Sequence, residues 1–203
     1  MSFSGKDEIL TIMNGDSKES SVIVSSNLRR AISTTTLALW PRVHRTKEKI
    51  FVLNSLQEIS RNIDTQALSD SNNLPDLSRI THELSDEGYH FNPVEVFDMT
   101  GNSGNKTLNF YGIKRLQAFN AWVFSRPEST FIVGGHSLWF KSFFQTYLPH
   151  KSDLPCKSKK IANSGVISFS LHKADKLNSN GEPSYRIDPE SVRTVYLGLE
   201  VKK

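Results

Sequence analysis

Arg30 and His136 each follow a short apolar run closely, and both side chains can bind a phosphoryl group. In open α/β sheets, the loops at the carboxyl ends of parallel strands converge, and helix N-termini there point unpaired N–H groups into the crevice. An arginine can bind two phosphoryl oxygens at once, and the helix N-termini add partial positive charge. Taken singly, such an arginine is usually a solvated charge and such a histidine usually structural. Together they indicate a site for a phosphate dianion.

The element that must position Arg30 is a strand, a tight turn and a helix. Val22–Val24 is a short β-branched run, and the following Ser25–Asn27 can cap a helix whose apolar positions lie between Leu28 and Leu39. Pro41 is predicted to end this helix, because proline lacks the backbone N–H that a helix interior needs. Ile50–Leu53 is predicted to form the next strand.

A second strand, turn and helix positions His136. Thr130–Val133 is predicted to be a buried strand, and Leu138–Tyr147 a helix after the turn that carries His136 and Ser137. Before this unit, apolar residues at spacings of three to four predict an amphipathic helix over Thr107–Ser125. After it, three more strands are expected, two of them flanking a polar turn at 178–181 as a hairpin. They are Val166–Leu171, Tyr185–Ile187 and Thr194–Leu199.

The alternation of strands and helices predicts one α/β domain over residues 1–203 with a mostly parallel sheet. A polar insertion is expected at about residues 69–104, with one short helix near Asp76–Ser85. The glycine-rich stretch Gly101–Thr107 superficially resembles a nucleotide P-loop, but Asn105 replaces the last required glycine. We interpret it as an insertion loop, from which Lys106 either reaches a substrate anion or stays solvated.

Four segments resemble the histidine phosphatase superfamily, in its phosphoglycerate-mutase-like form. Ser26–Thr34 is similar to the family's Ser-x-Leu-x-Arg-Ala-x-x-Thr segment, and Gly135–Ser137 to its second histidine turn. Between them, Leu56–Glu58 resembles the segment that carries the proton-donating carboxylate, and Lys159–Gly165 resembles a late turn containing asparagine. The resemblance spans about Val22–Leu171 and implies a three-layer α/β/α fold whose first strand is missing here.

The resemblance also implies a reaction, in which a neutral histidine attacks phosphorus and forms a phosphohistidine. Arg30, His136 and the Ser137 amide would bind the phosphoryl oxygens, and Glu58 would protonate the departing oxygen. The implied substrate is a phosphorylated small molecule or a phosphoprotein. No cofactor and no metal are required.

The nucleophile of that reaction is the histidine of an Arg-His-Gly segment upstream of the arginine segment, and this sequence has no histidine before His44. An N-terminally incomplete chain accounts for this, and Ile9–Met13 could partly replace the missing strand. Two functions stay open: phosphomonoester hydrolysis by the intact family member, or non-catalytic phosphate binding or protein interaction by a pseudophosphatase. Neither the oligomeric state nor the choice between phosphatase and mutase is indicated.

Composition narrows the remaining classes of function. Apolar content of 37% and charged content of 23% are ordinary for a globular protein, and no apolar run approaches the roughly 18 residues of a membrane span. A net charge of +4 is spread along the chain apart from Lys157–Lys160, so a nucleic-acid-binding stripe is not expected. Cys156 is the single cysteine, which suits a reducing compartment, and the acidic N-terminal segment is unlike a signal peptide. We therefore expect a cytoplasmic protein.

Overall fold

The structure is a computed structural model that describes residues 6–106, 112–177 and 181–200. Its central sheet has four strands in the order β3-β2-β1-β4, and every neighbouring pair is parallel. The strands are β1 (Ser21–Ser26), β2 (Ile50–Leu53), β3 (Phe97–Asp98) and β4 (Thr130–Gly134). The predicted α/β class with a parallel sheet is confirmed.

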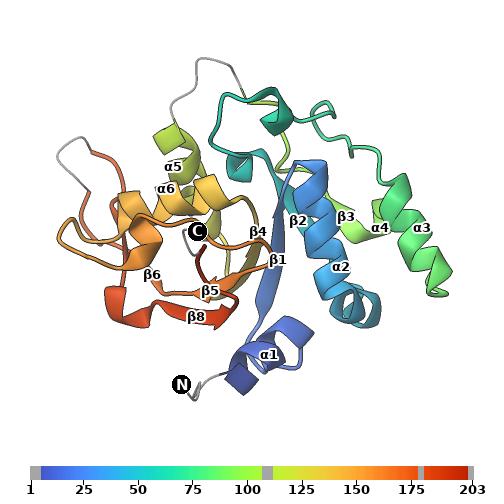
Figure 1. Cartoon of the computed structure of the whole chain (residues 1–203), viewed down its shortest axis with the longest axis horizontal. Coiled ribbons are helices and arrows are strands. Elements are labelled where there is room, and N and C mark those ends of the chain that lie inside the picture. The colour runs from blue at the N-terminus through green and yellow to red at the C-terminus, as the bar shows by residue number, and fades with distance from the viewer. Residues whose placement is uncertain (1–5, 107–111, 178–180, 201–203) are drawn as a thin grey trace.

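Helices cover both faces of this sheet (Figure 1). Successive side chains of a strand point to opposite faces, and β1 shows this clearly. Val22 and Val24 belong to an apolar cluster with α5 (Gly112–Val123) and α6 (Ser137–Tyr147). Ile23 belongs to a second cluster with α2 (Arg29–Thr46) and α3 (Ser78–Asp86). The strand β1 is therefore buried on both sides, as its continuous apolar run requires, whereas β4, which was predicted to be a buried strand, is only partly buried along its length.

The prediction that Pro41 ends its helix is wrong, because α2 continues to Thr46. Trp40 and Val43, on either side of the proline, are buried in the core, whereas Pro41 itself is exposed. Burial of these neighbours outweighs the one hydrogen bond that proline cannot make. The helix ends instead at Lys47, which adopts a left-handed conformation with φ of 58°.

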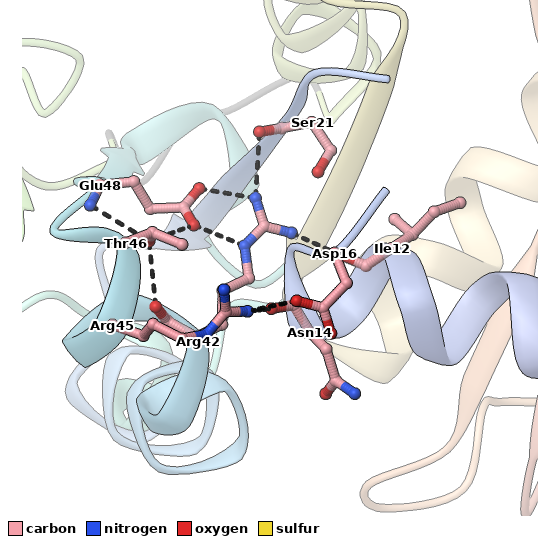
Figure 2. A network of polar contacts seen from close by, with 8 residues as sticks. All are labelled: Ile12, Asn14, Asp16, Ser21, Arg42, Arg45, Thr46 and Glu48. Atoms are coloured by element: carbon pink, nitrogen blue, oxygen red, sulfur yellow. Dashed lines mark hydrogen bonds and ion pairs between the residues drawn. The ribbon is translucent and has the colours of Figure 1, made fainter. Parts of the chain in front are cut away.

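The first helix, α1 (Lys6–Asn14), is tied to α2 by a polar network (Figure 2). Arg42 donates to both carboxylate oxygens of Glu48, at 2.5 and 2.6 Å, and to the carbonyl oxygens of Ile12 and Ser21, at 2.7 and 3.1 Å. Its side chain is only 4% exposed. One buried guanidinium therefore joins α1, β1 and the end of α2.

The predicted insertion contributes more structure than its polar composition indicates. The expected short helix is present as α3, and α4 (Pro93–Val96) leads into β3, which pairs with β2 at the edge of the sheet. Short 3₁₀ turns, η1 (Asn54–Leu56) and η2 (Ile63–Thr65), precede it. Six apolar side chains of the insertion are buried: Leu77, Ile80, Leu84, Phe91, Val96 and Phe97.

The C-terminal part forms two separate antiparallel pairs. The single strand predicted over 166–171 is divided into β5 (Val166–Ser168), which pairs with β8 (Arg193–Tyr196), and β6 (Leu171–Lys173), which pairs with β7 (Tyr185–Ile187). The pairing of β6 with β7 agrees with the expected hairpin, although most of its polar turn lies outside the described residues, as do residues 107–111 of the predicted helix before β4. Two further 3₁₀ turns are η3 (Pro155–Lys157) and η4 (Pro189–Ser191). Across the described ranges, no helix has both the length and the apolarity to cross a membrane.

Candidate functional site

The candidate site lies where three adjacent parallel strands end. In the order β2-β1-β4, Glu58 follows β2, Ser26 closes β1 and His136 follows β4. Nε2 of His136 lies 2.8 Å from Oγ of Ser26, and both side chains are buried. The pairing of Ser25 with Gly134 favours this contact, because it places Ser26, the last residue of β1, beside the residues that follow β4.

Glu58 reaches the N-terminus of α6. Its Oε1 accepts the backbone N–H of Trp139 at 3.0 Å and that of Ile59 at 3.1 Å. Burial raises the pKa of this carboxyl, against the opposing effect of these two hydrogen bonds and of the positive charges of Arg30 and Lys106. Glu58 is therefore placed to hold a proton more readily than a solvent-exposed glutamate.

His136 is a neutral imidazole in this environment. Burial lowers its pKa to about 3, and the positive charges of Arg30, Arg115 and Lys106 act in the same direction. The ring therefore carries one N–H donor and one acceptor nitrogen near neutral pH. A hydrogen bond from His136 to a phosphoryl oxygen would therefore come from a neutral ring, because the low pKa disfavours the protonated one.

Arg30 and Ser137 occupy their predicted positions at the starts of α2 and α6. Arg30 is the second residue of α2 and is exposed, and its Nη1 donates to the carbonyl oxygen of Asp64 at 2.7 Å. Ser137 is the first residue of α6, so its backbone N–H is one of the groups that cannot be satisfied within the helix. The four predicted site residues thus come from elements that meet at one end of the sheet.

Two cations that support the site were not expected in these roles. Lys106 does not extend over the pocket as a free charge, because its Nζ donates to Glu58 O at 2.8 Å, Ser60 O at 2.5 Å and Thr65 Oγ1 at 2.6 Å. Burial, followed by the charge of Arg115, lowers its pKa to about 8. It braces the loop that carries Glu58.

Arg115, a buried residue of α5, donates from Nη2 to the same Glu58 carbonyl oxygen at 3.2 Å. Burial lowers its pKa to about 10. Sequence reasoning assigned α5 to core packing and did not consider Arg115. The available signal was its spacing, because Arg115 lies four residues before the buried Phe119 and therefore on the apolar face of the helix.

The glycine-rich stretch before α5 forms a loop over its described residues 101–106, as expected. Asn27 Nδ2 donates to Asn102 Oδ1 at 2.9 Å and to Gly104 O at 3.1 Å, and Gln57 Nε2 donates to Asn105 Oδ1 at 2.6 Å. These amide contacts hold the loop against the residues that flank Arg30 and Glu58. Gly104 has a φ of 95°, which favours glycine at that turn.

His44, the first histidine of the sequence, has aromatic partners of its own. His44 packs against the rings of Trp40 and Tyr89, at 5.7 and 5.0 Å between centroids, in the α2–insertion layer. Among the residues that the structure describes, no group of three or more histidine, cysteine, aspartate or glutamate side chains is arranged to hold a metal ion.

Comparisons with models of known protein families, with curated proteins and with solved structures found no match.

Proposed function

We propose that the site at the ends of β2, β1 and β4 binds the phosphoryl group of a phosphomonoester, as in a phosphoglycerate-mutase-like histidine phosphatase with a three-layer α/β/α fold. The observation that carries the proposal is the convergence of Arg30, Glu58 and His136 from three neighbouring parallel strands. The carboxyl edge of such a sheet is where α/β proteins bind their ligands.

Each side chain has a distinct role in this proposal. Arg30 supplies a guanidinium that can bind two phosphoryl oxygens, and the Ser137 amide adds the partial charge of the α6 N-terminus. Neutral His136 donates a hydrogen bond to a third oxygen. Glu58, whose pKa is raised by burial, would protonate the departing oxygen. The substrate would be a phosphorylated small molecule or a phosphoprotein.

A second function, phosphate binding without hydrolysis, is favoured by one observation. Among the described residues, those that hydrogen-bond Glu58 or His136 include no second histidine, and the charged groups that shift their pKa values are arginines and a lysine. A phosphohistidine needs a nucleophilic ring beside the bound phosphoryl group. We therefore expect the 203-residue chain to bind phosphate without measurable hydrolysis of a phosphomonoester.

The binding proposal is tested by titrating inorganic phosphate into the protein by calorimetry. Arg30→Ala is expected to weaken binding at least tenfold, because it removes the bidentate ligand. Arg29→Ala is the matched control, since Arg29 is the exposed neighbour in the same helical turn and carries the same charge. Equal losses in both variants would show a diffuse charge effect and contradict the proposed site.

Turnover of p-nitrophenyl phosphate separates the two functions. Binding with no turnover supports the non-catalytic function for this chain. Turnover that persists in the chain but disappears in Glu58→Gln supports hydrolysis with Glu58 as the acid. Turnover unaffected by both Glu58→Gln and His136→Gln would place the chemistry elsewhere and overturn the assignment.

A further inference from the structure

Ser26 and His136 form a buried pair whose protons can be assigned from their contacts. Oγ of Ser26 lies 2.8 Å from Nε2 of His136, and either atom can be the donor, because a neutral imidazole carries its proton on one nitrogen or the other. Ser26 has no exposed surface, and His136 is only 5% exposed. The hydroxyl of Ser26 must therefore make its hydrogen bonds within the protein.

The hydroxyl proton of Ser26 has a single acceptor within reach. In the described part of the chain, Oγ of Ser26 has two partners: the backbone N–H of Leu28, at 3.3 Å, and Nε2 of His136. A backbone N–H can only donate, so Leu28 uses a lone pair of the oxygen. The neighbouring Ser25 hydroxyl donates to the carbonyl oxygen of Ser26 at 3.1 Å. Among the described residues, Nε2 is therefore the acceptor that remains for the Ser26 proton.

The other tautomer of His136 would leave a buried donor without an acceptor. If Nε2 carried the ring proton, it would donate to Oγ of Ser26, and the hydroxyl proton would then have no partner. A buried donor left in this way is disfavoured by a factor of about ten. The ring holds only one proton near neutral pH, because burial lowers its pKa to about 3. The contacts therefore favour protonation at Nδ1.

We propose that Ser26 is a positioning residue, whose hydroxyl fixes His136 in the tautomer protonated at Nδ1 and so makes Nδ1–H the donor that this ring offers to an anion. Within the described residues, Nδ1 has no hydrogen-bond partner. The charged side chains that act on the ring are those of Arg30, Arg115 and Lys106, and such cations carry no acceptor. The acceptor for Nδ1–H therefore comes from solvent or from a bound anion.

The surrounding elements hold the Ser26 hydroxyl in place. Ser26 is the last residue of β1 and pairs with Leu53 of β2, while the other neighbour of β1 is β4, which leads to His136. Leu28, whose N–H binds Oγ, caps the start of α2, and Arg30 is the second residue of that helix. One hydroxyl thus connects the helix that carries Arg30 with the ring of His136. Donation from Nδ1–H to a phosphoryl oxygen rests on the proposed function, whereas the tautomer does not.

Nitrogen-15 NMR distinguishes the two tautomers, because protonated and unprotonated imidazole nitrogens resonate far apart. The sample is the full 203-residue chain at pH 7 with ¹⁵N in its histidine rings, and the signals lost in His136→Gln identify the ring of interest. We expect a protonated Nδ1 and an unprotonated Nε2, with this tautomer favoured about tenfold or more. A proton on Nε2 would overturn the proposal.

Variants of the two adjacent serines show whether the Ser26 hydroxyl is the cause. Ser26→Ala is expected to lower the ratio of the two tautomers about tenfold, and Ser26→Thr, which keeps a hydroxyl, to restore it. Ser25→Ala is the matched control, because Ser25 is equally buried in the same strand and its hydroxyl bonds a carbonyl oxygen instead of the ring. An unchanged ratio in Ser26→Ala, or an equal change in Ser25→Ala, would contradict the assignment. The spectrum of the unmodified chain decides the tautomer even if a variant at this buried position fails to fold.

Inorganic phosphate connects the tautomer to the proposed site. If only the form protonated at Nδ1 binds, the apparent affinity falls with the fraction of the chain in that form. Ser26→Ala is therefore expected to weaken phosphate binding about twofold in calorimetry, and Ser26→Thr to restore it. In the unmodified chain, phosphate should shift the Nδ1 signal of His136 more than the Nε2 signal. A larger shift at Nε2 would contradict the assigned donor.

Three further outcomes are distinguishable. Failure of phosphate to bind, with Nδ1 of His136 still protonated, would contradict the proposed function and leave the tautomer supported. Phosphate binding to a ring protonated at Nε2 would contradict the tautomer alone. Phosphorylation of Ser26 after incubation with p-nitrophenyl phosphate, detected by mass spectrometry, would identify Ser26 as a nucleophile and overturn its assignment as a positioning residue.

Discussion

At the level of single residues, burial moves two ionisable groups of the site toward their neutral forms. Burial raises the pKa of Glu58 and lowers that of His136 to about 3. Positive charge is then concentrated on Arg30, Lys106 and Arg115. In the function proposed above, these cations would attract a phosphate dianion, and the carboxyl and imidazole groups would supply hydrogen bonds and a proton.

The depressed pKa of His136 predicts acid destabilisation. Its ordinary pKa is 6.5, so between pH 6.5 and 3 the unfolded chain binds a proton that the folded protein excludes. The stabilising contribution is complete above pH 6.5 and is lost as pH falls toward 3, with a slope of at most about 1.4 kcal/mol per pH unit. His136→Gln should flatten this part of the curve in urea unfolding experiments repeated at several pH values.

Glu58 is expected to change the free energy of unfolding with pH in the opposite direction to His136, and so serves as a control. Its raised pKa contributes stability that is complete below the ordinary value of 4.5 and is lost as pH rises through the folded value. Glu58→Gln should therefore gain stability relative to the unmodified protein as pH rises. A His136→Gln variant with an unchanged slope would show that this ring is protonated normally in the folded state.

The sequence indicated the residues of the proposed phosphate site but not the residues that brace them. Arg30 and His136 stand out because each lies just after an apolar run, a local pattern. Lys106 and Arg115 become relevant only through the Glu58 carbonyl oxygen, to which both donate. That contact joins residues about fifty positions apart, and no short-range spacing encodes it.

Among the helices, α1 is attached through polar groups, and this attachment can be tested. Glu48→Ala would leave the guanidinium of Arg42 buried without its carboxylate, at a cost of about 3 kcal/mol. Glu83→Ala is the control, because its partner Arg79 has a side chain 91% exposed and such surface pairs contribute about 0.5 kcal/mol or less. Urea unfolding measures both. Comparable losses would show that Arg42 is hydrated in solution.

Element boundaries were predicted best where local pattern and packing agree. Ile50–Leu53 was predicted at its observed bounds because it is a continuous apolar run with polar residues on both sides. Pro41 was misjudged because its local cost is smaller than the burial of its neighbours. Phe97–Asp98 was missed because two residues carry no period, and only pairing with β2 makes them a strand.

For the whole molecule, the order of the strands could not be predicted from sequence. Parallel strands need crossover connections, so the residues that pair are far apart in the chain, and the order depends on which faces are buried. Val22 and Ile23 illustrate this dependence, because their side chains are buried in different apolar clusters on opposite faces of the sheet. The same arrangement leaves β4 at an edge of the four-stranded sheet in the part of the chain that the structure describes.

The insertion should unfold together with the rest of the molecule. Leu84 is 2% exposed and shares its apolar cluster with Ile23 of β1 and Ile32 of α2. Leu84→Ala is expected to lower the free energy of unfolding by about 2–5 kcal/mol, because it leaves a cavity between layers. Urea unfolding followed by far-ultraviolet circular dichroism measures this, and Leu68→Ala, at an 80% exposed position, should change stability by less than about 0.5 kcal/mol.

Hydrogen exchange in the same variant tests whether the insertion and the central sheet unfold as one cooperative unit. If α3 and β1 belong to one cooperative unit, Leu84→Ala should lower the hydrogen-exchange protection factors of their backbone amides equally. Both elements would then exchange through the same opening reaction. Faster exchange confined to α3, with β1 unchanged, would show that residues 69–104 open independently. In that case the edge strand β3 would not be required to hold β2 and the Glu58 loop in place.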